Sequence, residues 1–334
     1  MISITRKRLF LIVFFFPLVV LRAQDVHFAD VQQMAQWYNQ AIKTDRLRDF
    51  KANIRDIQYE NAVAFKTGTV LCNITMLKKA DRLSQDGKSY MNISAGATYD
   101  QSNSGLYKKS SQLIGVSYAT MIDNKNTYIS VGFQGNFTST RLGANGIYPD
   151  QFDQWGPISG SSSNDPLRFG RSYNYFSLNT GIAAFRNTLE REWYVGASIR
   201  HVNRPYTEQT KSPEFQMART WSTQAGYKFK FDYSSFDIYG IMNWKAGASE
   251  YLGAIRYNLS LNNTSQKDAE LTAGRQNIVL GLGCGIRLKD ALIPSLSLAF
   301  NKTQLGAHLD LNTSGIQTGG FKRNGFELSI TQKF

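Results

Sequence analysis

Residues 323–334 read RNGFELSITQKF, and this stretch indicates the fold more clearly than any other part of the chain. Phe326, Leu328, Ile330 and Phe334 occupy alternate positions, and the residues between them are mostly polar. Side chains of a β-strand point alternately to the two faces of its sheet, so the pattern predicts a strand with one apolar and one polar face.

The same alternation recurs along the chain in segments of about ten residues separated by polar turns, which is typical of membrane-spanning barrels. Lys and Arg occur inside otherwise good strands, and a polar lumen accommodates them where a packed sandwich core excludes them. The terminal aromatic residue, Phe334, resembles the targeting signal of bacterial outer-membrane barrels. We therefore predict an all-β protein, a transmembrane antiparallel β-barrel of about 14 strands with a short N-terminal periplasmic segment.

The predicted strands are the segments in which apolar and polar residues alternate. They cover residues 48–58, 66–77, 90–100, 110–121, 126–138, 173–186, 191–202, 219–231, 235–246, 250–260, 268–275, 277–288, 293–303 and 323–334.

Connection lengths agree with this strand count if the N-terminus is periplasmic, because short turns then follow even-numbered strands and longer loops follow odd-numbered ones. The expected short turns are 123–125, 187–190, 232–234 and 289–292, and the expected long connections are 139–172, 203–218 and 304–322. The longest, 139–172, is rich in Gly, Ser, Asn and Pro, and we expect it to be an extracellular loop.

The start of the chain has the pattern of a secretory signal peptide. Basic residues 6–8 precede an apolar run over 9–16, and Ala23 supplies a small residue for cleavage before Gln24. The apolar run is shorter than the ~20 residues that a membrane-spanning helix needs. We expect residues 1–23 to be cleaved.

Residues 24–47 lie between this signal peptide and the first predicted strand. We expect them to form an N-terminal segment that is periplasmic or plugs the barrel mouth, followed by an outer-membrane barrel over 48–334.

The formal net charge of the chain is +13. For an exported chain without a nucleic-acid motif we expect no nucleic-acid partner, and lipopolysaccharide, acidic lipids or an acidic protein are the expected counter-charges. Cys72 and Cys284 are far apart in sequence and do not form a disulfide framework, so we expect buried or lipid-facing thiols.

The sequence shows no set of residues that predicts catalysis, a cofactor or a metal site. His27, His201 and His308 are the three histidines, and they lack metal-ligand spacing. The best local pair for a hydrolase is Ser198 with His201, but three residues apart on one strand they should point to opposite faces. We predict that the protein is not an enzyme.

Scattered motifs along the chain are similar to those of the PorP/SprF family, membrane proteins of the type IX secretion system of Bacteroidetes. They are residues 24–28, 38–41, 148–153, 196–205 and 325–330. In the two N-terminal motifs Val26 and Gln40 stand where the family has proline, a departure that bears on the docking of a periplasmic partner.

The resemblance implies an outer-membrane component that binds or anchors secreted cargo, such as surface or gliding adhesins, and contacts periplasmic subunits of the secretion system. Candidate partner-contact residues at the predicted extracellular side are Asp150, Gln151, Phe152, Trp155, His201 and Arg204. Two alternatives stay open: a diffusion channel or apolar-ligand transporter, and a barrel enzyme.

Overall fold

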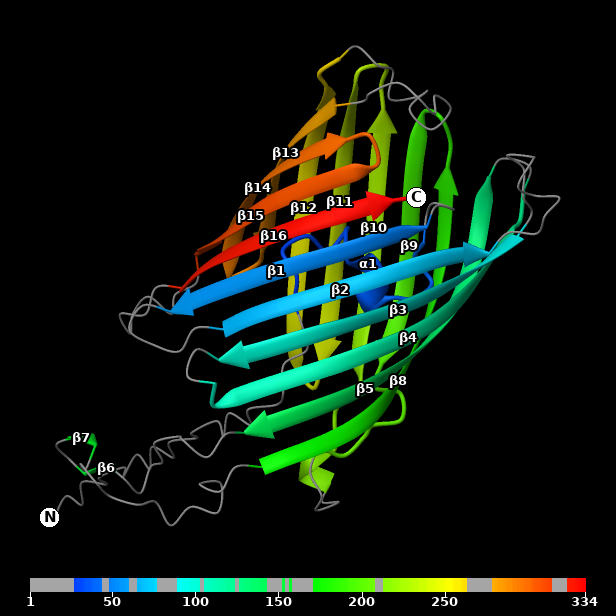
Figure 1. Ribbon diagram of the computed structural model, residues 1–334. Coiled ribbons are helices and arrows are strands. Elements are labelled where there is room, and N and C mark those ends of the chain that lie inside the picture. The colour runs from blue at the N-terminus through cyan, green and yellow to red at the C-terminus, as the bar shows by residue number, and fades with distance from the viewer. Residues whose placement is uncertain are drawn as a thin grey trace, which may run out of the picture.

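The computed structural model describes residues 27–43, 48–59, 65–76, 89–102, 105–123, 126–142, 152–153, 156–157, 171–207, 213–262, 278–313 and 323–334. In this part of the chain, strands from β1 to β16 form one closed antiparallel barrel, in which β1 pairs with both β2 and β16 (Figure 1). The predicted fold class, an all-β antiparallel barrel, is confirmed.

The barrel strands follow one another around the ring in sequence order. They are β1 (Asp49–Tyr59), β2 (Phe65–Met76), β3 (Ser89–Ser102), β4 (Tyr107–Met121), β5 (Thr127–Leu142), β8 (Arg171–Asn187), β9 (Arg191–Arg200), β10 (Thr220–Lys230), β11 (Ser234–Lys245), β12 (Ala248–Ser260), β13 (Ile278–Arg287), β14 (Ala291–Phe300), β15 (Thr303–Asn312) and β16 (Arg323–Lys333). Short elements are α1 (Ala35–Tyr38), η4 (Pro213–Phe215), and a separate pair of strands, β6 (Phe152–Asp153) and β7 (Gly156–Pro157).

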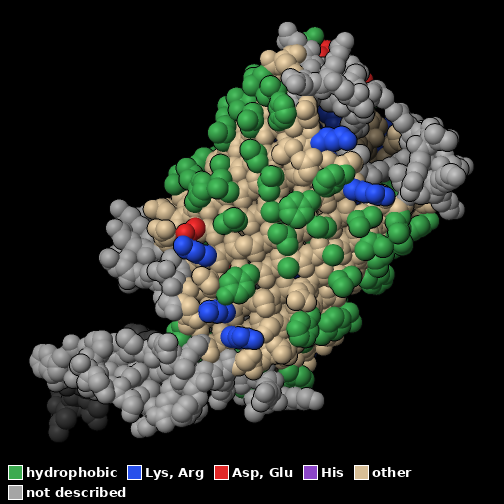
Figure 2. Space-filling view, in the orientation of Figure 1, with side chains coloured by type: hydrophobic (Ala, Val, Ile, Leu, Met, Phe, Trp, Pro, Cys, Tyr) green, Lys and Arg blue, Asp and Glu red, His purple; other side chains and the backbone are tan. Residues whose placement is uncertain are grey.

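Apolar side chains cover the outside of the barrel, and polar side chains line its lumen. Ile54, Ile114 and Phe133 are more than 60% exposed, whereas Asn92 and Ser177 are fully buried. Figure 2 shows hydrophobic side chains spread over the outer face of the strands. This inside-out distribution suits a lipid-facing wall around a polar interior. Among the described helices, none is long and apolar enough to cross a membrane.

Every predicted strand except the eleventh coincides with an observed strand within a few residues. The eleventh, 268–275, lies outside the described residues. The prediction of a loop over 304–322 is wrong, because β15 occupies Thr303–Asn312. Only residues 301–302 separate β14 from β15, so in the sequence the start of β15 cannot be told from the end of β14.

Because of these differences, β13 and β14 run through the barrel in the direction opposite to the predicted one. We call the end of the barrel where β1 begins and β16 ends the terminal end, and the opposite end the loop end. The connection 288–290 was expected among the short turns at the terminal end, but it joins β13 to β14 at the loop end. β4, β8 and β10, which precede the other three predicted short turns, end at the terminal end as expected, and β5 and β9 end at the loop end.

Candidate functional site

Residues 27–43, here called the luminal segment, lie inside the barrel. Figure 1 shows its helix α1 within the ring of strands. Phe28, Met34, Trp37 and Tyr38 are at most 5% exposed and belong to an apolar cluster with wall residues. The wall contributes Leu71, Leu113, Tyr239, Ile241, Leu252, Ala291 and Ile293 to this cluster. Of the two placements expected for residues 24–47, the structure has residues 27–43 in the lumen.

Local contacts give the luminal segment its compact shape. The backbone N–H of Gln33 donates to Asp30 Oδ1 at 3.1 Å, which closes the turn that precedes α1. The ring of Phe28 packs edge-on against Trp37 and Tyr38, with centroids 6.1 and 5.9 Å apart. The segment therefore folds back on itself and presents side chains to the wall on several sides.

Inward-facing glycines allow residues 37–41 to approach the wall closely. They stand on five consecutive strands, and they are Gly96, Gly115, Gly132, Gly181 and Gly196. A Cβ atom at Gly132 would lie 2.6 Å from the backbone nitrogen of Ala41, and one at Gly181 would collide with Asn39 Oδ1. Glycine is the one residue that leaves room for another backbone at such positions.

Hydrogen bonds join the same residues to the wall. Asn39 Nδ2 donates to the carbonyl oxygens of Ile182 and Ala197, at 3.1 and 3.3 Å. Gln40 Nε2 donates to Ser94 Oγ at 2.7 Å, and the Ser198 hydroxyl donates to the carbonyl oxygen of Tyr38 at 2.9 Å. The motif at residues 38–41 is therefore buried in the barrel, where its polar groups bond to the wall.

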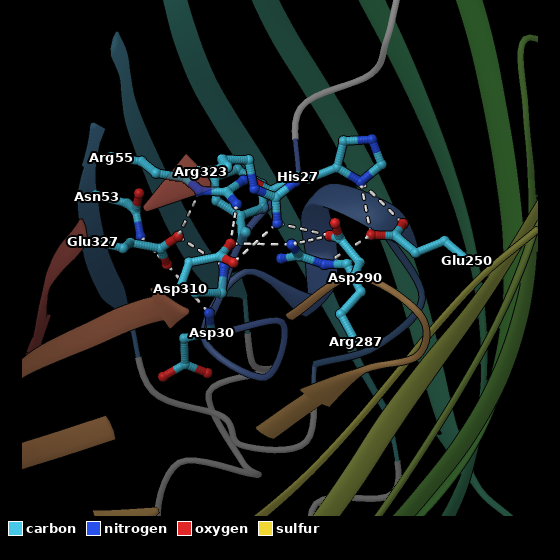
Figure 3. Close-up of polar contacts among 12 residues, drawn as sticks. His27, Asp30, Asn53, Arg55, Glu250, Arg287, Asp290, Asp310, Arg323 and Glu327 are labelled. Atoms are coloured by element: carbon cyan, nitrogen blue, oxygen red, sulfur yellow. Dashed lines mark hydrogen bonds and ion pairs between the residues drawn. The ribbon is translucent and has the colours of Figure 1, made fainter. Parts of the chain in front are cut away.

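A network of buried ions lies beside the start of the luminal segment (Figure 3). Asp310 is its centre, with its carboxylate 2.7 Å from Arg55, 3.0 Å from Arg287 and 3.1 Å from Arg323. Asp290 bonds to Arg287 and Arg323, each at 2.9 Å. The side chain of Asp310 is 2% exposed, so these guanidinium groups are paired with a shared carboxylate and not with water.

The network also binds the luminal segment directly. The carboxylate of Glu327 accepts hydrogen bonds from the backbone N–H groups of Ala29 and Asp30, at 2.7 and 3.2 Å. Arg55 donates to the carbonyl oxygen of His27 at 2.5 Å, and His27 Nδ1 lies 2.9 Å from the Glu250 carboxylate. Charged donors and acceptors make the strongest hydrogen bonds, so this end of the segment is held firmly.

The carboxylate of Asp30 forms a separate charged contact between the luminal segment and the wall, with Arg256 and His308. Burial raises the pKa of Asp30, but Arg256 at 2.8 Å and His308 at 3.6 Å outweigh burial and hold the pKa at about 2, below the ordinary 3.8. A depressed pKa stabilises the docked segment above about pH 3.8, and that contribution is lost as the pH falls through the folded value.

We expect Asp30→Asn to loosen the luminal segment at neutral pH. Ion conductance of the purified barrel in planar bilayers should rise in the wild type as the pH falls from about 4 toward about 2. The Asp30→Asn barrel should conduct more at neutral pH and lack this step. Asp56→Asn, on the outward face, is the matched control and should behave like the wild type; a retained step in Asp30→Asn would contradict the assignment.

The predicted partner-contact residues do not come together in the described structure. Asp150, Gln151 and Trp155 lie outside the described residues, and Phe152 is described only as backbone of β6. Arg204 is exposed at the loop end, in a turn where its φ of 46° is left-handed. Phe334 is 64% exposed, and its N–H donates to the carbonyl oxygen of Arg48.

The expectation that Ser198 and His201 point to opposite faces is wrong. His201 has a left-handed φ of 58°, which interrupts the alternation at the end of β9. Ser198 and His201 are 4% and 5% exposed, and both lie on the luminal side. The Ser198 hydroxyl donates to the luminal segment, whereas the backbone N–H of His201 donates to Asn179 Oδ1 in the wall, so Ser198 serves the docking of that segment.

No sequence motif marks the charged wall residues that hold the luminal segment. Arg55, Arg256, Asp310 and Glu327 each stand at an inward position of an alternating strand. The rule that Lys and Arg inside alternating strands line the lumen marks Arg55 and Arg256 as candidates. Glu327 stands on the polar face of the last predicted strand, but Asp310 falls in the predicted loop 304–322. Within the described residues, no cluster of His, Cys, Asp and Glu could hold a metal ion. Cys72 is exposed on the outward face of β2, and Cys284 is half-buried.

A family model described as type IX secretion system membrane protein PorP/SprF matches residues 82–331. No curated protein matches the chain. A FadL homologue from Pseudomonas aeruginosa is similar in structure, with a TM-score of 0.48, 10% identity, and coverage of 90% of this chain and 98% of that chain. The toluene transporter TodX from P. putida gives a TM-score of 0.44 at 8% identity, over 86% of this chain and 90% of that chain.

Proposed function

Because the chain belongs to the PorP/SprF family of type IX secretion system membrane proteins, we propose that it binds or anchors secreted cargo at the outer membrane. In this proposal the barrel is an interaction component that holds surface or gliding adhesins and links them to periplasmic subunits of the system. A cleaved signal peptide over residues 1–23 delivers the chain to the periplasm before insertion.

The observation that carries this proposal is the luminal segment. Residues 27–43 cross the lumen, are mostly buried, and bond to strands around the ring. A lumen occupied by the chain's own backbone suits a protein that binds at its rims better than one that conducts solutes. The proposal involves no catalytic step and no cofactor.

The alternative class, a diffusion channel or apolar-ligand transporter, requires that solute pass the luminal segment. The proposal therefore predicts that the wild-type barrel shows no steady ion conductance in planar bilayers at neutral pH. Steady conductance of the purified wild-type protein would favour a channel function over a binding function.

Crosslinked pull-down from native outer membranes, followed by mass spectrometry, tests the binding function. We expect secretion-system subunits or a large secreted adhesin to be recovered with the wild type. Arg204→Glu, at the loop end, should reduce recovery of cargo because it reverses a rim charge. Arg191→Glu, an exposed arginine at the terminal end, is the matched control. Recovery of the barrel alone at good yield would contradict the proposal.

A further inference from the structure

A cavity of about 380 Å³ opens at the terminal end, between the luminal segment and the wall. The luminal segment forms one side of it with Asp30, Gln33, Gln36 and Lys43. The opposite side comes from the start of β1 and from the ends of strands β8 to β16 and their turns. The volume is within the range of about 300–1,000 Å³ that is usual for ligand sites.

The lining of this cavity is basic. Its positive residues outnumber its negative ones by seven to four. The basic residues are Lys43, Lys51, Lys228, Lys230, Lys302, Lys333 and Arg256, and the acidic ones are Asp30, Asp49, Glu192 and Asp237. A cleft lined mainly by one sign of charge concentrates ligands of the opposite sign.

Lys43 forms a close buried pair with Asp49 at 2.7 Å, and two further lysines face carboxylates at distances longer than a hydrogen bond. Lys228 Nζ is 3.8 Å from Asp237, and Lys230 Nζ is 3.9 Å from Glu192. The side chain of Lys228 is 30% exposed, and Lys302 is exposed at the mouth. These ammonium groups are spread around the rim, so they match carboxylates spaced along a chain better than one compact, multiply charged phosphate.

Gln36 adds a feature that points to a peptide. The residue is 1% exposed and lines the cavity, and both its Nε2 and Oε1 lack a hydrogen-bond partner among the described residues. A buried amide without partners costs free energy, and a peptide group offers it one acceptor and one donor. An extended backbone beside Gln36 would satisfy both atoms.

We propose that the cavity binds an extended acidic peptide, contributed by a periplasmic partner of the barrel. Carboxylates of the peptide pair with Lys228 and Lys302 at the mouth, and its backbone pairs with Gln36. The assignment of the peptide to a periplasmic subunit rests on the proposed function, whereas the chemistry of the site does not. Because residues of the luminal segment line the site, a bound peptide contacts the segment and the wall together.

Fluorescence anisotropy of the full barrel in detergent tests the proposal, with a labelled eight-residue peptide of alternating Glu and Gly. We expect saturable binding that weakens with added salt, and no binding of the Gln–Gly peptide of equal length. The double variant Lys228→Gln/Lys302→Gln should bind the acidic peptide at least about tenfold more weakly, since each tenfold loss corresponds to about 1.4 kcal/mol.

The matched control is Lys66→Gln/Lys108→Gln, which removes the same charge from exposed lysines at the loop end. It should leave peptide binding unchanged. Gln36→Leu should weaken the acidic peptide but not inorganic polyphosphate, which has no peptide group. Equal loss in both double variants, polyphosphate binding as tight as the peptide, or an unaffected Gln36→Leu would each overturn the proposal.

The pull-down described above separates the two proposals. If the peptide does not bind but secretion subunits are recovered with the barrel, the cavity proposal fails and the proposed function stands. If the peptide binds as expected and no subunit or cargo is recovered, the site is supported and the proposed function fails.

Discussion

Gly181→Val is expected to drive the luminal segment out of the lumen and turn a closed barrel into a conducting one. The valine Cβ would occupy the position of Asn39 Oδ1. The neighbouring strand β9 leaves no room beside it, because Ser198 Cβ is 3.1 Å from the same point. Displacing Asn39 removes its hydrogen bonds to Ile182 and Ala197. Overpacking of this kind costs about 1–3 kcal/mol or more, and release of the segment relieves it.

The measurement is single-channel conductance in planar bilayers, together with the rate at which a protease cuts residues 27–43 in the folded barrel. We expect steady conductance and fast cutting for Gly181→Val, and neither for the wild type. Gly68→Val is the matched control, because a Cβ at Gly68 meets nothing within 4 Å. A silent, protease-resistant Gly181→Val barrel of native strand content would show that the close approach at Gly181 is not needed for docking.

Asp310→Asn is expected to cause the largest loss of stability among single substitutions in the lumen. The carboxylate pairs with Arg55, Arg287 and Arg323, and removing its charge leaves three buried or half-buried guanidinium groups sharing Asp290, Glu327 and Glu250. Removing one partner from a buried ion pair costs about 3–5 kcal/mol, because the remaining charge stays out of water.

Urea unfolding of the barrel from lipid vesicles, followed by tryptophan fluorescence, measures this loss. The control is Asp56→Asn, whose carboxylate is 30% exposed and 3.7 Å from Lys66. An exposed pair contributes at most about 1 kcal/mol, so the control should unfold almost as the wild type does. Equal free energies of unfolding for the two variants would contradict the view that Asp310 holds the network together.

Both substitutions act on the luminal segment by different physical means. Gly181 governs its steric fit at residues 37–41, whereas Asp310 pairs with Arg55, which donates to the carbonyl oxygen of His27 at the start of the segment. The contacts involved span most of the sequence: Arg55 and Asp310 are 255 residues apart, and Ala29 and Glu327 are 298 apart. No local pattern connects such residues.

What the sequence alone determined is the part of the structure that depends on local periodicity. Alternation of period two predicted nearly every strand, the apolar exterior and the polar lumen, because each strand must present one face to lipid and one to the interior. β15, the strand that the prediction missed, has the same alternation. Because only residues 301–302 separate it from β14, the pattern does not show where β15 begins.

Only the tertiary structure decided what fills the barrel and which charges meet there. Ring closure brings β1 beside β16, and so sets Arg55 and Glu327 near the luminal segment. The backbone reversal at His201, the room left by Gly132 and Gly181, and the pairing of Asp30 with Arg256 depend on register between distant strands. Register is a property of the closed sheet as a whole, whereas periodicity is a property of each strand. A sequence read one segment at a time therefore shows the periodicity but not the register.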